Sequence, residues 1–346
     1  MNFKLTGFLS LLLLPLIVSA QNRTSTPEGT FRDATSQDFA AENISSKYFN
    51  ELWTYHIQLE NGMQVIYAFS INDFGSFKGR VTGAKLIIQW KDGKTYVVNK
   101  EYSPADFINE PDSNYIRLNP DKPYWAKGRF ENEHRLSFDG NKDGIEYELN
   151  LSLYDIATGK VLGDGVYNFG SNELGLYLLI PHAKVKGSVS INGEKVEAIG
   201  TAYMDRMYQN NLSTEIMDRS YRIKYGDDEN GLFLHFITIN AAGSKTPIGY
   251  GVRYQNGMAT MLTPSEIEQV KSTVKLDEEI VINPYQMDAF NVKVNKHYNT
   301  YSMLDELGRF KKFLAKQVIG GELIEMNGTI NIDNTKPGYF YYMVTD

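Results

Sequence analysis

Tyrosine, carboxylate and guanidinium side chains occur together at the end of one predicted strand, where they could bind or protonate a ligand. They are Tyr203, Asp205, Arg206 and Tyr208, within the run Gly200–Tyr208. A carboxylic acid can donate a proton near neutral pH if burial raises its pKa, and the face of a tyrosine ring attracts a cation. Spacing by itself favours a plainer interpretation, in which an exposed Asp–Arg pair and two packed tyrosines close a strand.

Several other kinds of catalytic site find no support in the sequence. The chain has no cysteine, which rules out thiolate nucleophiles and metal sites with cysteine ligands. It also lacks the G-x-S-x-G motif of serine hydrolases. The five histidines lack the spacing of metal ligands, although folding could still bring some together: His56, His134, His182, His235 and His297. We therefore predict neither a metal nor another cofactor.

The segment Asp139–Gly144 matches the first half of a calcium-binding loop, D-x-N-x-D-G. Such a loop needs a bidentate glutamate at its twelfth position, where this sequence has Asn150, and the flanking segments are predicted strands. Asp and Asn beside Gly are also typical of β-turns, because they tolerate left-handed backbone. The segment is therefore predicted to be a turn, with calcium binding as the alternative.

The candidate residues end a hairpin that is predicted over residues 180–210. Two runs of alternating polarity flank Asn192-Gly193, the strongest short-range signal for a type I′ turn. Taking these two residues as the loop pairs Ile191 with Glu194, Val189 with Val196, Gly187 with Ala198 and Val185 with Gly200. One face of the hairpin is then small and apolar and continues through Met204, whereas Tyr203 and Asp205 lie on the opposite face.

The run Gly200–Tyr208 resembles the G-x-x-Y/W-x-D-H-x-W signature of the AttH and hydroxyneurosporene-synthase (carotenoid hydratase) family. The hairpin before it is similar to that family's P-x-x-x-V-x-G segment, and weaker similarities lie at Trp53–Tyr55 and Gly338–Tyr342. The resemblance implies two tandem lipocalin-like β-barrels. The chain departs from the signature at two positions, since Arg206 stands for the family's histidine and Tyr208 for its tryptophan.

In that family, a carboxylic acid and a neighbouring imidazole are thought to protonate an isoprenoid double bond before water adds. The resemblance therefore implies Asp205 as the candidate acid and Tyr203 and Tyr208 as candidate catalytic walls. It also implies a ligand site formed by Tyr203, Arg206, Trp53 and Tyr55. Because a guanidinium group cannot relay a proton and would lower the pKa of Asp205, we expect binding of a lipophilic, isoprenoid- or lipid-like small molecule. The alternatives are a hydratase, isomerase or cyclase, and an envelope or structural protein that binds no ligand.

The N-terminus, Met1–Ala20, has the pattern of a secretory signal, with a basic Lys4, an apolar run and small residues before Gln21. The run is short and broken by Pro15, and no later stretch is long enough to span a membrane, so an exported periplasmic or secreted protein is expected. An uncleaved anchor is the alternative. The formal net charge is −7, or −8 without Lys4, and basic runs are absent. Nucleic acid and anionic membranes are therefore not expected partners, and the oligomeric state is left open.

Apart from this signal, the chain is predicted to be all-β, because the 23 tyrosines, 18 phenylalanines and 29 glycines of the full sequence suit pleated surfaces and turns. Residues 21–47 are a polar leader or loose loop, 48–210 a first barrel and 211–346 a second, with a boundary near 209–213. Strands are predicted at 52–59, 63–71, 85–90, 94–99, 124–130, 134–138, 145–154 and 174–179, then at 220–224, 231–239, 249–254, 258–262, 323–332 and 339–344.

One or two short helices are expected within the second barrel. A helix start is indicated by Thr263 as N-cap, Pro264 at the first helical position and Glu266 at the third. The apolar face of this helix would consist of Ile267, Val270 and Val274. A second helix follows from helical spacing over 303–314, although Gly308 weakens it.

Overall fold

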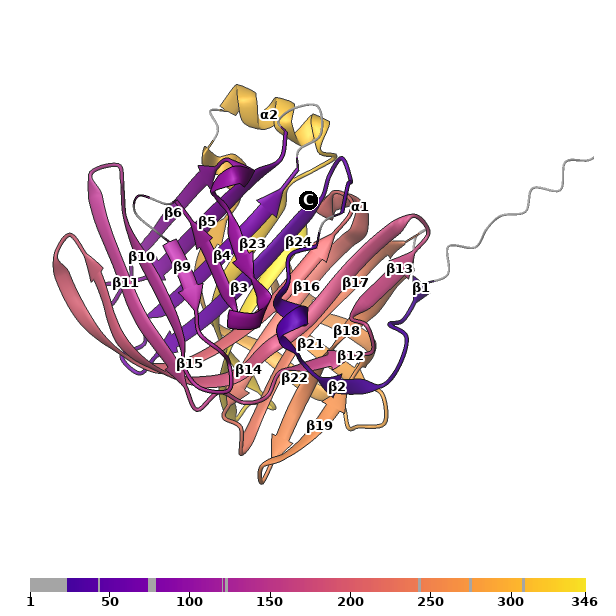
Figure 1. Cartoon of the computed structure of the whole chain (residues 1–346). Coiled ribbons are helices and arrows are strands. Elements are labelled where there is room, and N and C mark those ends of the chain that lie inside the picture. The colour runs from indigo at the N-terminus through magenta and orange to yellow at the C-terminus, as the bar shows by residue number, and fades with distance from the viewer. Residues whose placement is uncertain are drawn as a thin grey trace, which may run out of the picture.

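The computed structural model describes residues 24–42, 44–73, 79–119, 121, 124–241, 244–273, 276–306 and 309–346. The predicted signal Met1–Ala20 lies outside these residues. Within them, the fold is almost entirely antiparallel β, in two sheets that follow one another in the sequence (Figure 1). The prediction of an all-β fold with two lipocalin-like barrels is confirmed.

The first sheet forms a half-barrel from the strands before residue 210. Its strands are ordered β6-β5-β4-β3-β15-β14-β11-β10-β9-β8-β7. Their bounds are β3 (Asn50–Leu59), β4 (Gln64–Asn72), β5 (Val81–Gln89), β6 (Thr95–Tyr102), β7 (Ile108–Glu110), β8 (Tyr115–Leu118), β9 (Tyr124–Lys127), β10 (His134–Lys142), β11 (Ile145–Tyr154), β14 (Asn172–Ile191) and β15 (Glu194–Gln209). Four short strands pair beside this path: β1 (Thr24–Ser25), β2 (Phe31–Asp33), β12 (Lys160–Leu162) and β13 (Val166–Phe169).

The second sheet curls into a nearly closed barrel and is drawn in orange and yellow in Figure 1. Its strands are ordered β19-β18-β17-β16-β24-β23-β22-β21-β20. Their bounds are β16 (Met217–Gly226), β17 (Asn230–Ala241), β18 (Ser244–Gln255), β19 (Met258–Leu262), β20 (Pro264–Ser272), β21 (Asp277–Pro284), β22 (Phe290–Tyr301), β23 (Leu323–Ile332) and β24 (Lys336–Thr345).

The predicted central hairpin is the pair β14 and β15, and its register agrees with the alternation of the sequence. Ile191 pairs with Glu194 and Val185 with Gly200, as the two-residue turn requires. Asn192 and Gly193 have φ of 50° and 77°, the two left-handed residues of a type I′ turn. The strands continue well beyond the turn, with register shifts between Leu178 and Ala183. The hairpin therefore carries Tyr203–Tyr208 into the middle of the first sheet.

Replacing Gly193 with valine is expected to lower the free energy of unfolding by about 1–2 kcal/mol, because a β-branched residue is strained at positive φ. A Cβ atom at this position would meet no other atom within 4 Å, so crowding does not contribute. Urea unfolding of the Gly193→Val variant measures the effect. Gly193→Asn is the matched control, since asparagine tolerates the left-handed region. Equal midpoints for wild type and Gly193→Val would contradict the prediction.

Three hydrophobic clusters hold the sheets together. One fills the first barrel and includes Tyr55, Met204 and Tyr208. A second fills the other barrel. The third lies between the sheets, where Tyr203 of β15 meets residues of β17, β18 and β24 such as Phe233. Where the two sheets meet, each is therefore buried on both faces, by its own barrel core on one side and by the other sheet on the other. Polar side chains that point away from a barrel core are enclosed between the sheets in this region.

The helix predicted from Thr263 is wrong, because residues 264–272 form the edge strand β20. The capping pattern gave a false signal, since proline is also tolerated at the start of an edge strand. Pairing with β21 supplies the backbone hydrogen bonds that a helix would have made internally. Ile267 packs against the core of the second barrel, whereas Val270 is exposed. Val274 lies outside the described residues.

The second predicted helix corresponds to two helical pieces. A 3₁₀ turn, η4 (Met303–Glu306), precedes the helix α2 (Arg309–Val318), and Gly308 lies outside the described residues. The other helical segments are short: η1 (Ser36–Phe39), η2 (Pro104–Asp106), η3 (Pro111–Ser113) and α1 (Ser213–Ile216). The segment with the calcium-loop pattern ends in a turn, with Asp143 and Gly144 at φ of 54° and 79°, whereas its first four residues belong to β10 and pair with β11.

Candidate functional site

Alternation along β15 sends the predicted site residues to opposite sides of the first sheet. Successive side chains of a strand point to opposite faces. Met204 and Tyr208 belong to the core of the first barrel, and Arg206 lies on their side, whereas Tyr203 faces the second sheet together with Asp205. Tyr203 and Tyr208 therefore cannot be two walls of one ligand site, which corrects that hypothesis.

Asp205 is buried between the sheets and is held by groups from both. Arg222 of β16 donates from Nε to Oδ2 at 2.6 Å and from Nη2 to Oδ1 at 3.2 Å. The Tyr203 hydroxyl donates to Oδ2 at 2.8 Å. His235 of β17 places Nδ1 3.2 Å from Oδ2, without the alignment of a hydrogen bond, and its Nε2 lies 2.8 Å from the Ser220 hydroxyl. The carboxylate is thus the centre of a network that joins the two sheets.

The charges around Asp205 decide its protonation state. Burial alone would raise its pKa, but the charge of Arg222 and the contact with His235 hold the pKa of Asp205 well below its usual range. Burial, together with the charge of Arg222, lowers the pKa of His235 to about 4. At neutral pH the pair therefore consists of an ionised carboxylate and a neutral imidazole.

This protonation state is the opposite of the one that a general acid requires. An acid that protonates a carbon–carbon double bond must hold its proton at working pH, which calls for a raised pKa. The ion pair with Arg222 does not favour Asp205 as that acid, and the role of Asp205 stays a prediction. A guanidinium group does lower the pKa of Asp205, as the sequence predicted, but it belongs to Arg222, because Arg206 pairs with Glu51 instead.

A cavity between the two sheets borders the ion pair. It measures about 40 Å³, room for roughly three water molecules, and about 410 Å³ when the space that opens toward solvent is included. Residues from both sheets line it, among them His56, Ile66 and Tyr203 from the first sheet and Arg222, Lys224 and Tyr341 from the second. Asp205 itself does not line it, so the cavity meets the ion pair through Tyr203 and Arg222.

Three polar atoms of residues that line the cavity are buried without a hydrogen-bond partner among the described residues. They are Nη1 of Arg222, Nε2 of His56 and Oε1 of Gln58. An unsatisfied buried donor or acceptor costs about 1–3 kcal/mol, so each calls for an explanation. The His56 ring lies 4.9 Å from the Tyr341 ring, and burial, with the charge of Arg222, lowers the pKa of His56 well below its usual range. The wall therefore presents a cationic donor beside a neutral imidazole and aromatic rings.

Arg206 occupies a different site, inside the first barrel. Its Nε donates to Glu51 at 2.7 Å, and Nη2 lies 2.6 Å from Glu51 and 2.9 Å from Glu42. The guanidinium carbon lies 4.7 Å from the Tyr177 ring centre and 5.6 Å from that of Tyr208. Burial raises the pKa of Glu51 to about 7, although the charge of Arg206 and its hydrogen bond act to lower this pKa. Every donor group of this arginine is occupied by the protein itself.

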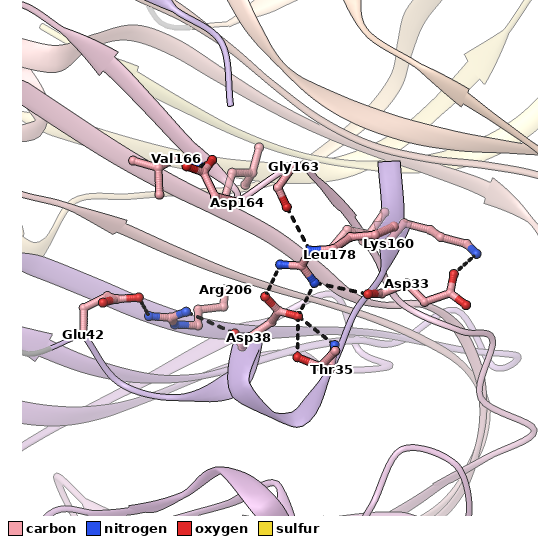
Figure 2. Close-up of polar contacts among 12 residues, drawn as sticks. Asp33, Thr35, Asp38, Glu42, Lys160, Gly163, Asp164, Val166, Leu178 and Arg206 are labelled. Carbon is pink, nitrogen blue, oxygen red and sulfur yellow. Dashed lines mark hydrogen bonds and ion pairs between the residues drawn. The ribbon is translucent and has the colours of Figure 1, made fainter. Parts of the chain in front are cut away.

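The segment before β3 is held in place by these charges, as Figure 2 shows. Arg206 donates from Nη1 to the main-chain oxygen of Asp38 at 3.0 Å. The Asp38 carboxylate is paired with Arg32, at 2.6 Å, and accepts from the main chain of Thr35 at 2.7 Å. This polar segment was predicted as a leader or loose loop, but its described part, 24–42 and 44–47, is fixed by specific contacts rather than loose.

Trp53 and Tyr55, the two aromatic residues assigned to a ligand site, are core residues of the first barrel. Trp53 is fully buried, donates from Nε1 to the Phe39 carbonyl at 3.0 Å and lies under the Arg206 guanidinium. The Tyr55 hydroxyl lies 2.8 Å from Nε2 of His134, whose Nδ1 lies 2.6 Å from the Gly128 carbonyl. The structure therefore groups Trp53 with Arg206 and separates both from Asp205.

Sequence reasoning missed the residues that complete the site between the sheets. Ser220, Arg222 and Lys224 are spaced two residues apart on β16, so they share one face of the strand. This spacing is the sequence signal that could have grouped them. His235 is the imidazole beside Asp205, whereas His182, the histidine nearest to Asp205 in the sequence, packs against Phe233. The weak family similarity at Gly338–Tyr342 did point to the strand that carries Tyr341, although not to its role.

A second and larger depression, of about 430 Å³, is lined by residues 40–42 and by residues of the first sheet and its connections, among them Thr82 and Phe107. Its lining residues include none of the unpartnered buried polar atoms of the described structure.

In the described part of the chain, no three acidic or histidine side chains gather as metal ligands would. No helix there has the length and apolar character that crossing a membrane requires.

No family model and no curated protein sequence matches the chain. Solved structures do match it over most of its length. A protein of Nitrosomonas europaea provisionally assigned as an AttH has a TM-score of 0.62 at 14% identity, covering 89% of this chain and 95% of that one. CghA, solved with Sch210972, has a TM-score of 0.60 at 9% identity, covering 92% and 98%. Kievitone hydratase from Nectria haematococca has a TM-score of 0.51 at 14% identity, covering 94% and 96%. The resemblance first seen at Gly200–Tyr208 is thus confirmed in three dimensions, and the chain has the double-lipocalin fold of the AttH-like proteins.

Proposed function

We propose that the protein binds a lipophilic small molecule that carries an oxygen acceptor, in the cavity between the two sheets. The observation that supports this most is the unpartnered cationic donor Nη1 of Arg222, which lies in a residue that lines the cavity together with His56 and Gln58, whose Nε2 and Oε1 are also unpartnered. A ligand oxygen would satisfy the guanidinium group and remove the cost of burying it unpaired. If these positions served only the stability of the fold, apolar side chains would be favoured there. Polar side chains at these buried positions therefore suit a binding role.

The rest of the cavity wall sets the character of the ligand. Ile66, Tyr203 and Tyr341 provide apolar and aromatic surface, which suits a hydrocarbon body. The narrow inner part, about 40 Å³, accepts the polar end of a molecule rather than a whole isoprenoid chain. The body of the ligand would then extend along the space that opens toward solvent.

Binding is better supported than acid-catalysed hydration. Kievitone hydratase is named for such a reaction and shares this fold, but at 14% identity the likeness extends to the fold alone. In this chain, the carboxylate at the signature position is ionised and fully engaged with Arg222, and its neighbouring imidazole is neutral. Neither group holds the spare proton that hydration of an alkene needs.

Filling the cavity is expected to weaken ligand binding. Ile66→Phe adds a ring to the cavity wall, and we expect it to weaken binding of isoprenoid alcohols, tested from citronellol to farnesol, by tenfold or more. Ile87→Phe is the matched control, because Ile87 pairs with Ile66 across β4 and β5 and belongs to the same buried cluster but does not line the cavity. Both variants carry the overpacking cost of about 1–3 kcal/mol, so only the cavity distinguishes them.

Isothermal titration and native mass spectrometry at pH 7.5 measure the binding of each alcohol. Equal losses in both phenylalanine variants would attribute the effect to overpacking. Failure of every alcohol in the series to bind the wild-type protein would count against a lipophilic ligand.

A further inference from the structure

Lys224 is a buried lysine without an acidic partner. It lies on β16 two residues beyond Arg222, on the face that meets the first sheet, and it is 8% exposed. Among the described residues, its Nζ makes one hydrogen bond, a long one of 3.4 Å to the Thr201 hydroxyl, and no carboxylate lies within ion-pair distance. Burying an unpaired ammonium group is costly, and a methionine would fill the same space without that cost. Structural packing therefore does not account for this side chain.

The groups around Lys224 favour its uncharged form. The titratable residues that face it or share its cavity are His56 of β3, His182 of β14, Tyr203 of β15, Arg222 of β16, and Tyr339 and Tyr341 of β24. At neutral pH, this set contributes one positive charge, that of Arg222, and no negative charge. Asp227 and Asp228 follow the end of β16 and act on His182. Burial lowers the pKa of Lys224 to about 7, so a large share of its amines are unprotonated at neutral pH.

We propose that Lys224 is a covalent reaction site, at which Nζ condenses with the carbonyl group of an aldehyde or ketone ligand to form an imine. This inference rests on the proposed binding cavity and makes its ligand more specific, because the oxygen acceptor becomes a carbonyl oxygen. A lysine that is desolvated in an apolar pocket is the ordinary starting point for such chemistry, since only the free amine has a lone pair to donate.

The condensation balances without any further reactant. The lone pair of Nζ forms a bond to the carbonyl carbon, and the carbonyl π electrons move to oxygen. A proton passes from nitrogen to that oxygen, which gives a carbinolamine. Loss of this oxygen as water, with formation of the carbon–nitrogen double bond, gives the imine. The cavity has room for water, so the proton can pass from nitrogen to oxygen through water, or through the neutral His56 ring if one ring nitrogen accepts a proton while the other donates one.

The placement of Arg222 suits the same reaction. Side chains two residues apart on one face of a strand start about 7 Å from each other. The free Nη1 donor of Arg222 can therefore hold the carbonyl oxygen while Nζ of Lys224 approaches the carbon beside it. Donation to the oxygen withdraws electrons from the carbon and stabilises the negative charge that develops during attack.

Reductive trapping tests this assignment on the full chain. The protein is incubated with citronellal and cyanoborohydride at pH 7, and the modified lysines are located by intact mass and peptide mapping. We expect Lys224 to be alkylated at least tenfold faster than the exposed Lys195 of the same protein. Between pH 7 and 10 the rate at Lys224 should level off, whereas the rate at Lys195 should keep rising, because an ordinary lysine titrates near pH 10.4.

Two variants and one competitor separate this inference from the proposed function. Lys224→Met must lose the fast adduct, and Ile66→Phe must slow alkylation of Lys224 by tenfold or more. Citronellol has no carbonyl group and should compete with citronellal for the cavity. If citronellol binds and Lys224 reacts no faster than Lys195, the covalent step is refuted while the binding function stands. If citronellol and its homologues do not bind and Lys224 is not selectively alkylated, the proposed function fails as well.

Discussion

Replacing Asp205 with asparagine is expected to lower the free energy of unfolding by about 3–5 kcal/mol, the usual cost of removing one partner of a buried ion pair. Asparagine keeps the shape of the side chain and can still accept from Tyr203, but it cannot neutralise Arg222, which is nearly fully buried. The guanidinium group would then be enclosed between the sheets with its charge uncompensated. Urea unfolding at pH 7.5, followed by circular dichroism and tyrosine fluorescence, measures the loss.

An exposed ion pair in the same sheet provides the control. Asp155 pairs with Lys184 at 2.8 Å, and their side chains are 61% and 56% exposed. Asp155→Asn should cost less than about 1 kcal/mol, because solvent screens such pairs. The pKa of Asp205 is lowered in the folded state, so its stabilising effect is complete above the unfolded pKa and fades only as the pH falls below about 4. The difference in free energy of unfolding between wild type and the Asp205→Asn variant should therefore stay constant from pH 5 to 8.

The same variant tests the hydratase alternative. Because Asp205 holds no proton at neutral pH, wild-type protein incubated with acyclic terpenoids should add little or no water. Robust hydration that disappears in a folded Asp205→Asn variant would overturn the assignment as a binding protein. It would show that Asp205 takes part in delivering the proton despite its ion pair with Arg222.

Replacing Arg206 with methionine is the second change with a large expected effect, again about 3–5 kcal/mol at pH 8. It leaves Glu51, which is fully buried, without its cation, beside the second carboxylate of Glu42. It also removes the bond to the main chain at Asp38, so the segment before β3 should be cleaved faster by trypsin. Arg135→Met is the control, because Arg135 is 62% exposed and pairs with Glu133 at the surface.

The effect of Arg206→Met should depend on pH in a defined direction. The pKa of Glu51 is raised to about 7 in the folded protein, so protonation of Glu51 favours the folded state. The contribution of Glu51 to the free energy of unfolding is therefore fully present below its unfolded pKa near 4.5, and it is lost as the pH rises through about 7. Removing Arg206 raises this pKa further, so the variant should lose less stability at pH 5 than at pH 8. Adding Glu51→Gln should restore much of the loss at pH 8, and a pH-independent loss would contradict this account.

Local patterns in the sequence were sufficient for the central hairpin and for the orientation of its residues. Asn192-Gly193 and strict alternation fix the register, because a slip by one residue would exchange the buried and exposed faces of both strands. The same alternation placed Asp205 on the face away from the first barrel, where the structure shows it between the sheets. The turn at Asp143-Gly144 was predictable for the same reason, since the backbone there requires residues that tolerate positive φ.

Capping signals were less reliable, because they depend on a few side chains whose preferences tertiary pairing can override. Thr263, Pro264 and Glu266 match a helix start, yet the segment becomes β20 because β21 is available to pair with it. The leader was misjudged for a related reason. Its polarity is typical of a loose segment, but Asp38 and Glu42 find buried or partly buried arginines in the folded barrel.

The partners of the candidate site were decided by tertiary structure alone. The sequence by itself determined the class of fold, the faces of β15 and the position of one carboxylate, because these follow from periods of two residues along a single strand. It could not determine that Arg222 and His235 meet Asp205, that Arg206 turns toward Glu51, or that Lys224 is buried without an acid. Those contacts depend on which faces of two separate sheets are pressed together, and no local pattern records that packing.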